Sequence, residues 1–328
     1  MILSVLAVVI GLVVLVWSAD RFVDGAVGVA QFLGMSTFLI GMLVVGFGTS
    51  APEMVVSILS AMNDTPQLAL GNAYGSNIAN IALILGATAL VAPVVVKTQA
   101  MLRDIPILIL MTVLTVLLLK DGNVSFADGA VLLVAFVALT LFNVFMELKE
   151  KRNREKESES SGEPAPVKSS IGKSVLWLLV GIALLIASSR LLVWGAVNIA
   201  QTLGVSDLLI GLTIVAVGTS LPELASSIAA ARRGENDLAV GNVIGSNAFN
   251  TLVVVGIAAV IAPINSTDPE VLSRDLPIMS ALTLLLFFIC FPLKNKVGKR
   301  VGGFGRIGGA LFLCLYVGYL VLLGIQSI

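Results

Sequence analysis

The hexapeptide Gly48-Thr-Ser-Ala-Pro-Glu53 returns as Gly218-Thr-Ser-Leu-Pro-Glu223, 170 residues further along the chain. A second stretch, Ala69-Leu-Gly-Asn-Ala-Tyr-Gly-Ser-Asn-Ile-Ala-Asn80, returns at the same offset as residues 239–250, with seven of twelve positions identical. Self-similarity at a fixed spacing is the mark of a repeated architecture. The chain is therefore predicted to consist of two related halves.

Composition indicates that both halves lie in a membrane. Of the 328 residues, 57% are apolar and only 12% are charged, and the mean hydropathy is +1.03. Soluble domains carry about 25% charged residues, so a soluble all-helical core would lack polar surface. The net charge of zero gives no field for nucleic acid. Histidine is absent, which removes the usual proton carrier near neutral pH and a common metal ligand.

Hydropathy predicts an all-α integral membrane protein with ten transmembrane helices. Residues 1–147 form the first five-helix repeat, residues 148–173 a flexible linker, and residues 174–328 the second repeat. The linker is rich in Glu, Lys, Ser and Pro and cannot bury enough apolar area to fold. Residues 26–33 fit the end of the first span as well as the start of the second. The predicted spans are 2–18, 22–62, 68–92, 103–119, 126–146, 174–195, 205–231, 237–262, 275–293 and 306–325.

The positions of Lys and Arg predict the orientation. Seventeen of these twenty residues fall in the loops on the linker's side, and three fall on the other side. Basic loops stay in the cytoplasm, so we expect a multi-pass protein of the inner (plasma) membrane with a cytoplasmic linker and both termini outside. Five spans per repeat is an odd number, so the second repeat crosses in the opposite sense. Inverted repeats are typical of secondary transporters, whose substrate site lies at the midplane.

Two acids lie deep inside apolar segments, and they are the glutamates of the repeated hexapeptide. A charged side chain at that depth costs roughly 2.5–3.5 kcal/mol. No Lys or Arg lies at comparable depth in any span. We therefore expect the charges of Glu53 and Glu223 to be met by a bound cation, by a proton, or by both.

The neighbouring residues favour a hard cation. Pro52 and Pro222 have no N–H, so each leaves a backbone carbonyl near its Glu without the usual helical hydrogen bond. Together with Thr and Ser hydroxyls they supply the oxygen ligands that Ca²⁺ and Na⁺ prefer. The second motif adds amide oxygens, although its small polar residues also suit helix packing, above all at Asn72 and Asn242. Two glutamates balance one divalent ion, and its departure requires sodium ions or protons because bare carboxylates repel.

The paired motifs resemble those of the sodium/calcium exchanger branch of the calcium/cation antiporter superfamily, in a prokaryotic form. The resemblance implies a ten-helix fold in which the first and sixth spans slide across the other eight. It assigns Ca²⁺ to Glu53 and Glu223, helped by Thr49 and Thr219. It implies no cofactor and a functional monomer in the lipid bilayer. The residues that it assigns to Na⁺ are Ser50, Ser76, Asn80, Ser220, Ser246 and Asn250, with Asn77, Asn247, Pro52 and Pro222 in support.

One position departs from the family pattern. Several relatives carry Asp where this chain has Asn250, so their site holds a third carboxyl group. The expected function is exchange of Na⁺ for Ca²⁺ by alternating access. The alternative is an H⁺/Ca²⁺ or other (K⁺-coupled) cation antiporter that uses the same glutamates. A channel is disfavoured by the inverted repeat, and an enzyme by the absence of any visible nucleophile–base set.

Overall fold

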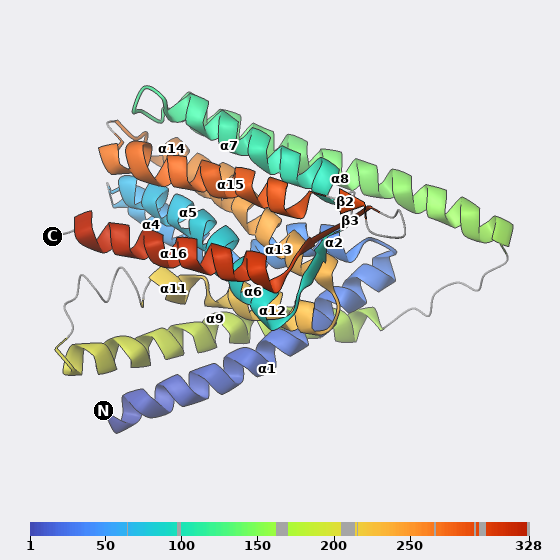
Figure 1. Cartoon of the computed structure of the whole chain (residues 1–328), viewed down its shortest axis with the longest axis horizontal. Helices are drawn as coiled ribbons and strands as arrows, with labels where there is room; N and C mark the ends of the chain where they lie inside the picture. The colour runs from blue at the N-terminus through green and yellow to red at the C-terminus, as the bar shows by residue number, and fades with distance from the viewer. Residues whose placement is uncertain are drawn as a thin grey trace.

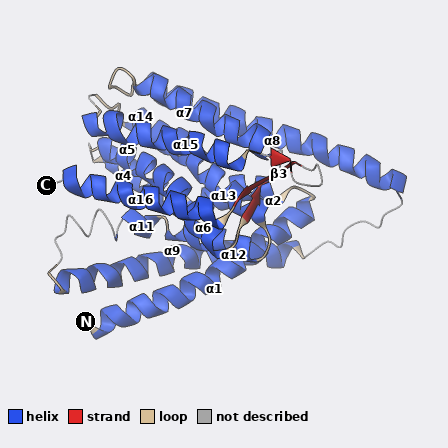
Figure 2. Ribbon diagram, viewed as in Figure 1, coloured by secondary structure: helices blue, strands red, loops and turns tan. Residues whose placement is uncertain are grey.

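The structure, a computed structural model, describes residues 1–63, 65–96, 100–161, 170–204, 214, 216–265, 267–291, 293–294 and 300–326. Nearly all of them are helical (Figure 2). The two termini lie at one end of the molecule, here called the terminal end, and α8 (Phe126–Ser161) reaches the opposite end, here called the linker end (Figure 1).

The first half begins with a single long helix, α1 (Ile2–Leu33), which ends at Gly34 in the left-handed conformation. The predicted boundary between residues 18 and 22 is therefore wrong. Asp20, Arg21 and Asp24 looked like a loop in the sequence, but they lie within α1 and form ion pairs at the linker end.

The second span is a broken helix, and the break falls inside the repeated hexapeptide. It consists of α2 (Thr37–Ile40), the π-helical segment η1 (Gly41–Val45), α3 (Gly46–Thr49) and α4 (Ala51–Met62). Residues 37–49 and 51–62 meet at an angle of 47°. Pro52 lies in the first turn of α4, where its missing N–H costs nothing.

The remaining elements of the first half follow in chain order. They are α5 (Gln67–Ile78), η2 (Ala79–Leu85), α6 (Gly86–Val91), β1 (Val94–Val96), η3 (Ala100–Asp104), α7 (Ile105–Leu119) and α8 (Phe126–Ser161).

The second half shows a similar series of elements. They are α9 (Ile171–Thr202), α11 (Ala216–Thr219), α12 (Leu221–Arg232), α13 (Asn236–Ala248), η5 (Phe249–Val254), α14 (Val255–Ile261), η6 (Val271–Asp275), α15 (Leu276–Cys290), β2 (Leu293–Lys294), β3 (Arg300–Phe304) and α16 (Arg306–Gln326). The first part of the predicted span 205–231 lies outside the described part of the chain. Between residues 205 and 215, the structure describes residue 214 alone.

Eight helices in the described residues are long and apolar enough to cross a membrane, and the bent pair in the second span makes nine. An integral all-α membrane protein is thus confirmed. The predicted second span starts at residue 37, not 22, because α1 takes up residues 22–33.

The predicted linker is in part helical, which composition did not indicate. α8 continues through Ser161, and α9 begins at Ile171, so residues 148–161 extend a membrane helix. Lys151 donates to the carbonyl of Leu33 at 2.9 Å, and Arg103 pairs with Glu150 at 3.3 Å. These contacts hold the extension of α8 against the ends of neighbouring elements.

Three short strands form a sheet that hydropathy did not predict (Figure 2). Their order is β1-β3-β2, and both pairings are antiparallel, with Val95 opposite Gly303 and Leu293 opposite Val301. The sheet joins segments that leave α6 and α15 to the segment that enters α16, so it ties the two halves together.

The helices α1 and α9 form a close pair along one side of the molecule (Figure 1). Glycines permit this approach in the absence of a hydrophobic driving force within lipid. A Cβ on Gly25 would lie 2.4 Å from the backbone nitrogen of Leu178, and one on Gly195 would lie 2.7 Å from the Ser4 carbonyl oxygen. These two glycines occupy the same position in the two halves.

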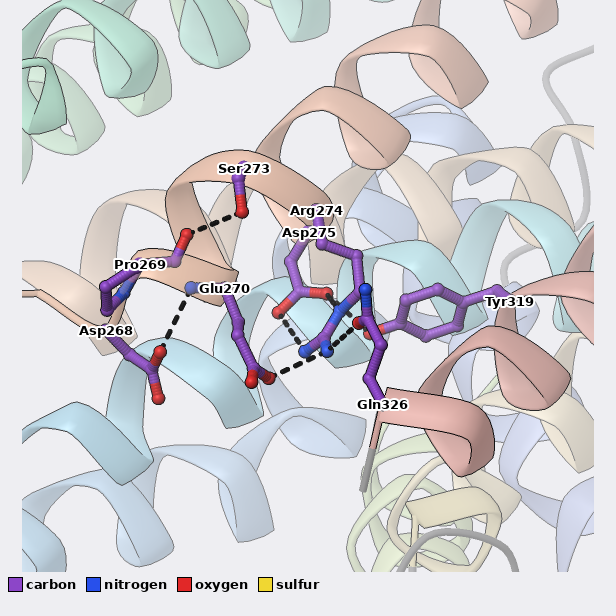
Figure 3. A network of polar contacts seen from close by, with 8 residues as sticks. All are labelled: Asp268, Pro269, Glu270, Ser273, Arg274, Asp275, Tyr319 and Gln326. Atoms are coloured by element: carbon purple, nitrogen blue, oxygen red, sulfur yellow. Dashed lines mark hydrogen bonds and ion pairs between the residues drawn. The ribbon is translucent and has the colours of Figure 1, made fainter. Parts of the chain in front are cut away.

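A polar network at the terminal end joins the start of α15 to the end of α16 (Figure 3). Arg274 donates to Asp275 and Glu270, each at 2.8 Å, and to Gln326 at 2.7 Å. Tyr319 donates to Asp275 at 3.0 Å. The network satisfies charges that would otherwise face the membrane interface.

Candidate functional site

Five acidic side chains are buried in the described part of the chain, and three of them are held by an ion pair or by two hydrogen bonds. Asp104 pairs with Arg103, and Asp275 pairs with Arg274. Glu147 accepts from the backbone N–H and the hydroxyl of Ser36, each at 2.7 Å. Glu53 and Glu223, which are 1% and 2% exposed, make no ion pair with any described basic residue.

The two unpaired glutamates occupy the same place in their helices. Each lies in the first turn of the helix that begins after the break in its hexapeptide. Glu53 lies on α4, and Glu223 lies on α12. The free N–H groups of a first turn favour negative charge. The Pro in each motif thus starts a helix inside the membrane and places a carboxylate at its positive end.

The hexapeptide of each half contacts the other half. Ser50 Oγ, from the hexapeptide that ends at Glu53, donates to Glu223 Oε1 at 3.4 Å. Thr49 Oγ1 lies 3.2 Å from Asn242 Oδ1 and 3.4 Å from Ser246 Oγ. The structure therefore brings both predicted half-sites together.

The second motif also crosses between the halves. Asn80 donates to Asn247 Oδ1 at 3.1 Å, and Asn77 donates to Thr251 Oγ1 at 2.7 Å. Asn80 lies in η2 and Asn250 lies in η5, so both fall in π-helical segments. Single π-turns inside α-helices are rare and are frequent at functional sites.

The buried polar atoms left without a hydrogen bond in this region are almost all oxygens. A buried polar atom costs free energy unless it has a partner. Such a set matches the ligands of a hard cation, and only the Asn247 amide nitrogen is an exception. The oxygens are Glu53 Oε1 and Oε2, Glu223 Oε2, Ser57 Oγ, Ser220 Oγ, and the Oδ1 atoms of Asn77, Asn80 and Asn250.

Two further predicted residues belong to the repeated motifs. Ser76 is buried on α5, and Thr219 is half-buried at the end of α11. A cluster of three or more Cys, Asp or Glu side chains able to hold a metal is absent from the described residues. The candidate site brings together two carboxylates and neutral oxygens, and that these atoms hold the transported cations stays a prediction.

Asn72 and Asn242 have a positioning role. Asn72 donates to the backbone carbonyl of Glu53 at 3.4 Å, and Asn242 donates to that of Glu223 at 3.3 Å. Asn242 also donates to Ser226 and Ser227, at 3.1 and 2.9 Å. The helix-packing interpretation therefore holds for Asn242, whose hydrogen bonds join α13 to the turn of α12 that carries Glu223.

Sequence reasoning missed two residues that contact the site. Thr251 accepts from Asn77, and Ser189 on α9 donates to the Gly218 carbonyl at 2.8 Å. The repeat gives no signal for either, because the equivalent residues are Ile81 and Ala19. Thr251 contacts Asn77 of the other half, whereas Ser189 and Gly218 belong to the same half and meet because α9 packs against α11.

Comparison with known proteins agrees with this geometry. Residues 3–145 and 173–324 match the family model described as sodium/calcium exchanger protein. CaxA of Alkalimonas amylolytica, which is named as an antiporter, is 43% identical over 98% of this chain and 99% of its own length. The sodium/calcium exchanger MaX1 of Methanosarcina acetivorans is 29% identical over 97% of both chains.

A solved structure shows the same fold. One structure of the sodium-calcium exchanger NCX_Mj superposes with a TM-score of 0.80 at 30% identity, covering 100% of this chain and 99% of the other. The family match spans both halves and all of the site residues described above. The chain belongs to the sodium/calcium exchanger family.

Proposed function

We propose that this protein exchanges Na⁺ for Ca²⁺ across the membrane by alternating access at a site built around Glu53 and Glu223. The observation that carries the proposal is the pair of buried carboxylates without a basic partner among the described residues, surrounded by unpartnered oxygens. Two charges balance one Ca²⁺. A bound divalent ion would remove the repulsion that the two carboxylates otherwise exert on each other.

Exchange follows from the same charges. If Ca²⁺ leaves, the two carboxylates remain in a low-dielectric interior, and this is costly unless other cations replace it. Na⁺ also prefers hydroxyl and carbonyl oxygens. We assign Thr49 and Thr219 to the Ca²⁺ site together with the glutamates, and Asn77, Asn247, Pro52 and Pro222 to positioning. The residues that we assign to sodium are Ser50, Ser76, Asn80, Ser220, Ser246 and Asn250.

We further propose ten membrane helices in two inverted repeats, with the linker in the cytoplasm and both termini outside. Matched elements support the repeat, because α4 and α12 each have twelve residues and start 170 positions apart. The span needed to bring the count from nine to ten is the predicted span 205–231. The structure describes its segment 205–215 only at residue 214. The distribution of Lys and Arg supports the orientation.

The test is ion flux in proteoliposomes with sodium, potassium and pH gradients imposed independently. We expect calcium uptake driven by an outward sodium gradient and unaffected by a protonophore. Uptake that follows the pH gradient and ignores sodium would replace this proposal with proton-coupled exchange, and dependence on potassium would indicate the potassium-coupled alternative.

Variants then test the site itself. Glu53→Gln and Glu223→Gln each remove half of its charge, so each should reduce calcium exchange by at least about 100-fold, or roughly 2.7 kcal/mol. Glu270→Gln is the matched control, because Glu270 is exposed and pairs with Arg274 at the terminal end. Exchange that persists in both site variants would refute the two-glutamate site.

A further inference from the structure

An ion-pair cluster at the linker end joins α1 to the loop that follows α12. Arg233 Nε lies 3.3 Å from Asp20 Oδ1, and Arg233 Nη1 contacts Asp24 Oδ1. Asp20 and Asp24 are four residues apart, so they lie on one face of α1. A single guanidinium group thus bridges two carboxylates on a helix whose membrane-spanning part is apolar.

Two cavities border the cluster. An apolar cavity of about 200 Å³ lies between α1 and α12, and its lining runs from Leu221, beside the break at Ser220, to Asp20 and Arg232. A second cavity, of about 470 Å³, is lined by Asp24 and Arg233 together with both polar and apolar residues. The Arg233–Asp20 pair therefore lies where a path between α1 and α12 would leave the site for the linker side.

Helix α12 links this cluster directly to the site. Glu223 lies in its first turn, and Arg233 directly follows its last residue, Arg232. A helix of twelve residues is a rigid connection on this scale, so a contact at Arg233 fixes the position of α1 relative to the carboxylate. Movement of α1 away from α12 requires both ion pairs to break.

Among the residues that the structure describes, the cluster has no equivalent at the terminal end. The offset of 170 residues relates Arg233 to Asn63, Asp20 to Arg190 and Asp24 to Trp194. The symmetry-related contact would place Arg190 and Trp194 against the neutral amide of Asn63, so no opposite charges would meet there. Opposite charges therefore meet across the helices at one end of the duplicated fold.

We propose that Arg233, Asp20 and Asp24 form the gate on the linker side of the transport path, which closes by ion pairing when α1 packs against α12. The gate rests on the alternating access proposed above. Because the ion pairs form at one end, they favour the state that is closed toward the linker over its inverted counterpart. They thereby set how often the site opens to each side of the membrane.

Thiol accessibility of the full-length protein in vesicles tests the gate without reference to the transported ion. Cys290 and Cys314 are first replaced by Ala, and a reporter is introduced as Ala229→Cys, since Ala229 lines the apolar cavity and is 7% exposed. A membrane-impermeant thiol reagent is applied on the side that carries residues 148–173. Arg233→Gln should raise the labelling rate roughly two- to tenfold, because exposed ion pairs contribute modestly.

Matched variants distinguish the gate from general loosening. Arg152→Gln removes the same charge from an exposed residue of α8 at the linker end and should leave labelling within about twofold of the parent rate. The double variant Arg233→Asp/Asp24→Arg restores opposite charges and should return labelling toward that rate. Ala225→Cys, which lines the same cavity, serves as a second reporter if Ala229→Cys fails to fold.

Unchanged labelling in both Arg233→Gln and Asp20→Asn/Asp24→Asn would overturn the gate. An equal increase in Arg152→Gln would also overturn it, because the effect would then belong to net charge. Either result leaves the ion-flux tests of Glu53 and Glu223 unaffected, so failure of the gate and failure of the exchange proposal can be told apart.

Discussion

One hydroxyl group on α9 binds a backbone carbonyl that the helix itself cannot satisfy. Pro222 has no N–H to offer the carbonyl of Gly218, four residues earlier. Ser189 Oγ donates to that oxygen at 2.8 Å. The equivalent residue on α1 is Ala19, which has no donor. The break in the second half is thus tied to α9 by a bond that the first half cannot make.

Ser189→Ala should leave the Gly218 carbonyl buried without this donor and destabilise the protein by about 1–3 kcal/mol. Thermal unfolding in detergent measures the loss. Ser188→Ala is the control, because Ser188 donates only to carbonyls of its own helix, Leu184 and Leu185. Equal stability of the two variants would show that the bond to Gly218 contributes nothing.

Residues on which the halves agree could be predicted from the sequence, and those on which they differ could not. Glu53 and Glu223 stood out because the same motif surrounds both, and the structure brings their halves into contact. Ser189 and Thr251 contact the site, but the equivalent positions of the first half hold Ala19 and Ile81. These contacts arise from tertiary packing, between the halves for Thr251 and within the second half for Ser189, and no local pattern encodes it.

At the scale of elements, the glycines of the second motif bring α13 close to the second span. On α13, Gly241 and Gly245 pack against the backbone of α2 and η1, and a Cβ on Gly245 would lie 2.1 Å from the Met42 carbonyl oxygen. The repeat relates Phe38 and Met42, which make this contact, to residues 208 and 212, which lie outside the described part of the chain. The close approach is therefore described for α13 alone.

Gly245→Ala should therefore separate α13 from η1 and cost about 1–3 kcal/mol through overpacking. Calcium exchange should fall with it, because Thr49 contacts Asn242 and Ser246 across this interface. Gly318→Ala makes the same change at an exposed position on α16, where no described heavy atom lies within 4 Å of the added Cβ, and should unfold near the parent temperature. A larger loss of stability in Gly318→Ala than in Gly245→Ala would contradict the packing described here.

Element boundaries were predicted less well than element identity. Charges at residues 20–24 suggested a loop, but α1 continues because those side chains pair with one another and with Arg233. Composition likewise suggested a linker from residue 148, whereas contacts of Glu150 and Lys151 accompany a helix that extends to Ser161. In both places, tertiary ion pairs and hydrogen bonds override the local signal.

At the scale of the whole molecule, the proposed site would couple ion binding to stability. The two carboxylates come from different halves, so a cation bound between them would join the halves as well as neutralise them. A ligand that binds the folded state alone stabilises it by about 2.7 kcal/mol at a concentration 100 times its dissociation constant. Two ionised carboxylates in a low-dielectric interior repel each other, and a bound cation would also remove that cost.

Calcium should consequently raise the unfolding temperature of the purified protein, and the increase should approach a logarithmic dependence on calcium concentration. Excess sodium should reduce the calcium-induced part of the shift, because both ions require the same carboxylates. Glu53→Gln should lose most of the calcium response, while Glu270→Gln, which alters an exposed acid at the terminal end, should keep it. If calcium and sodium raised the unfolding temperature of the parent protein additively, the two ions would occupy independent sites. The competition for Glu53 and Glu223 on which the proposed exchange depends would then be wrong.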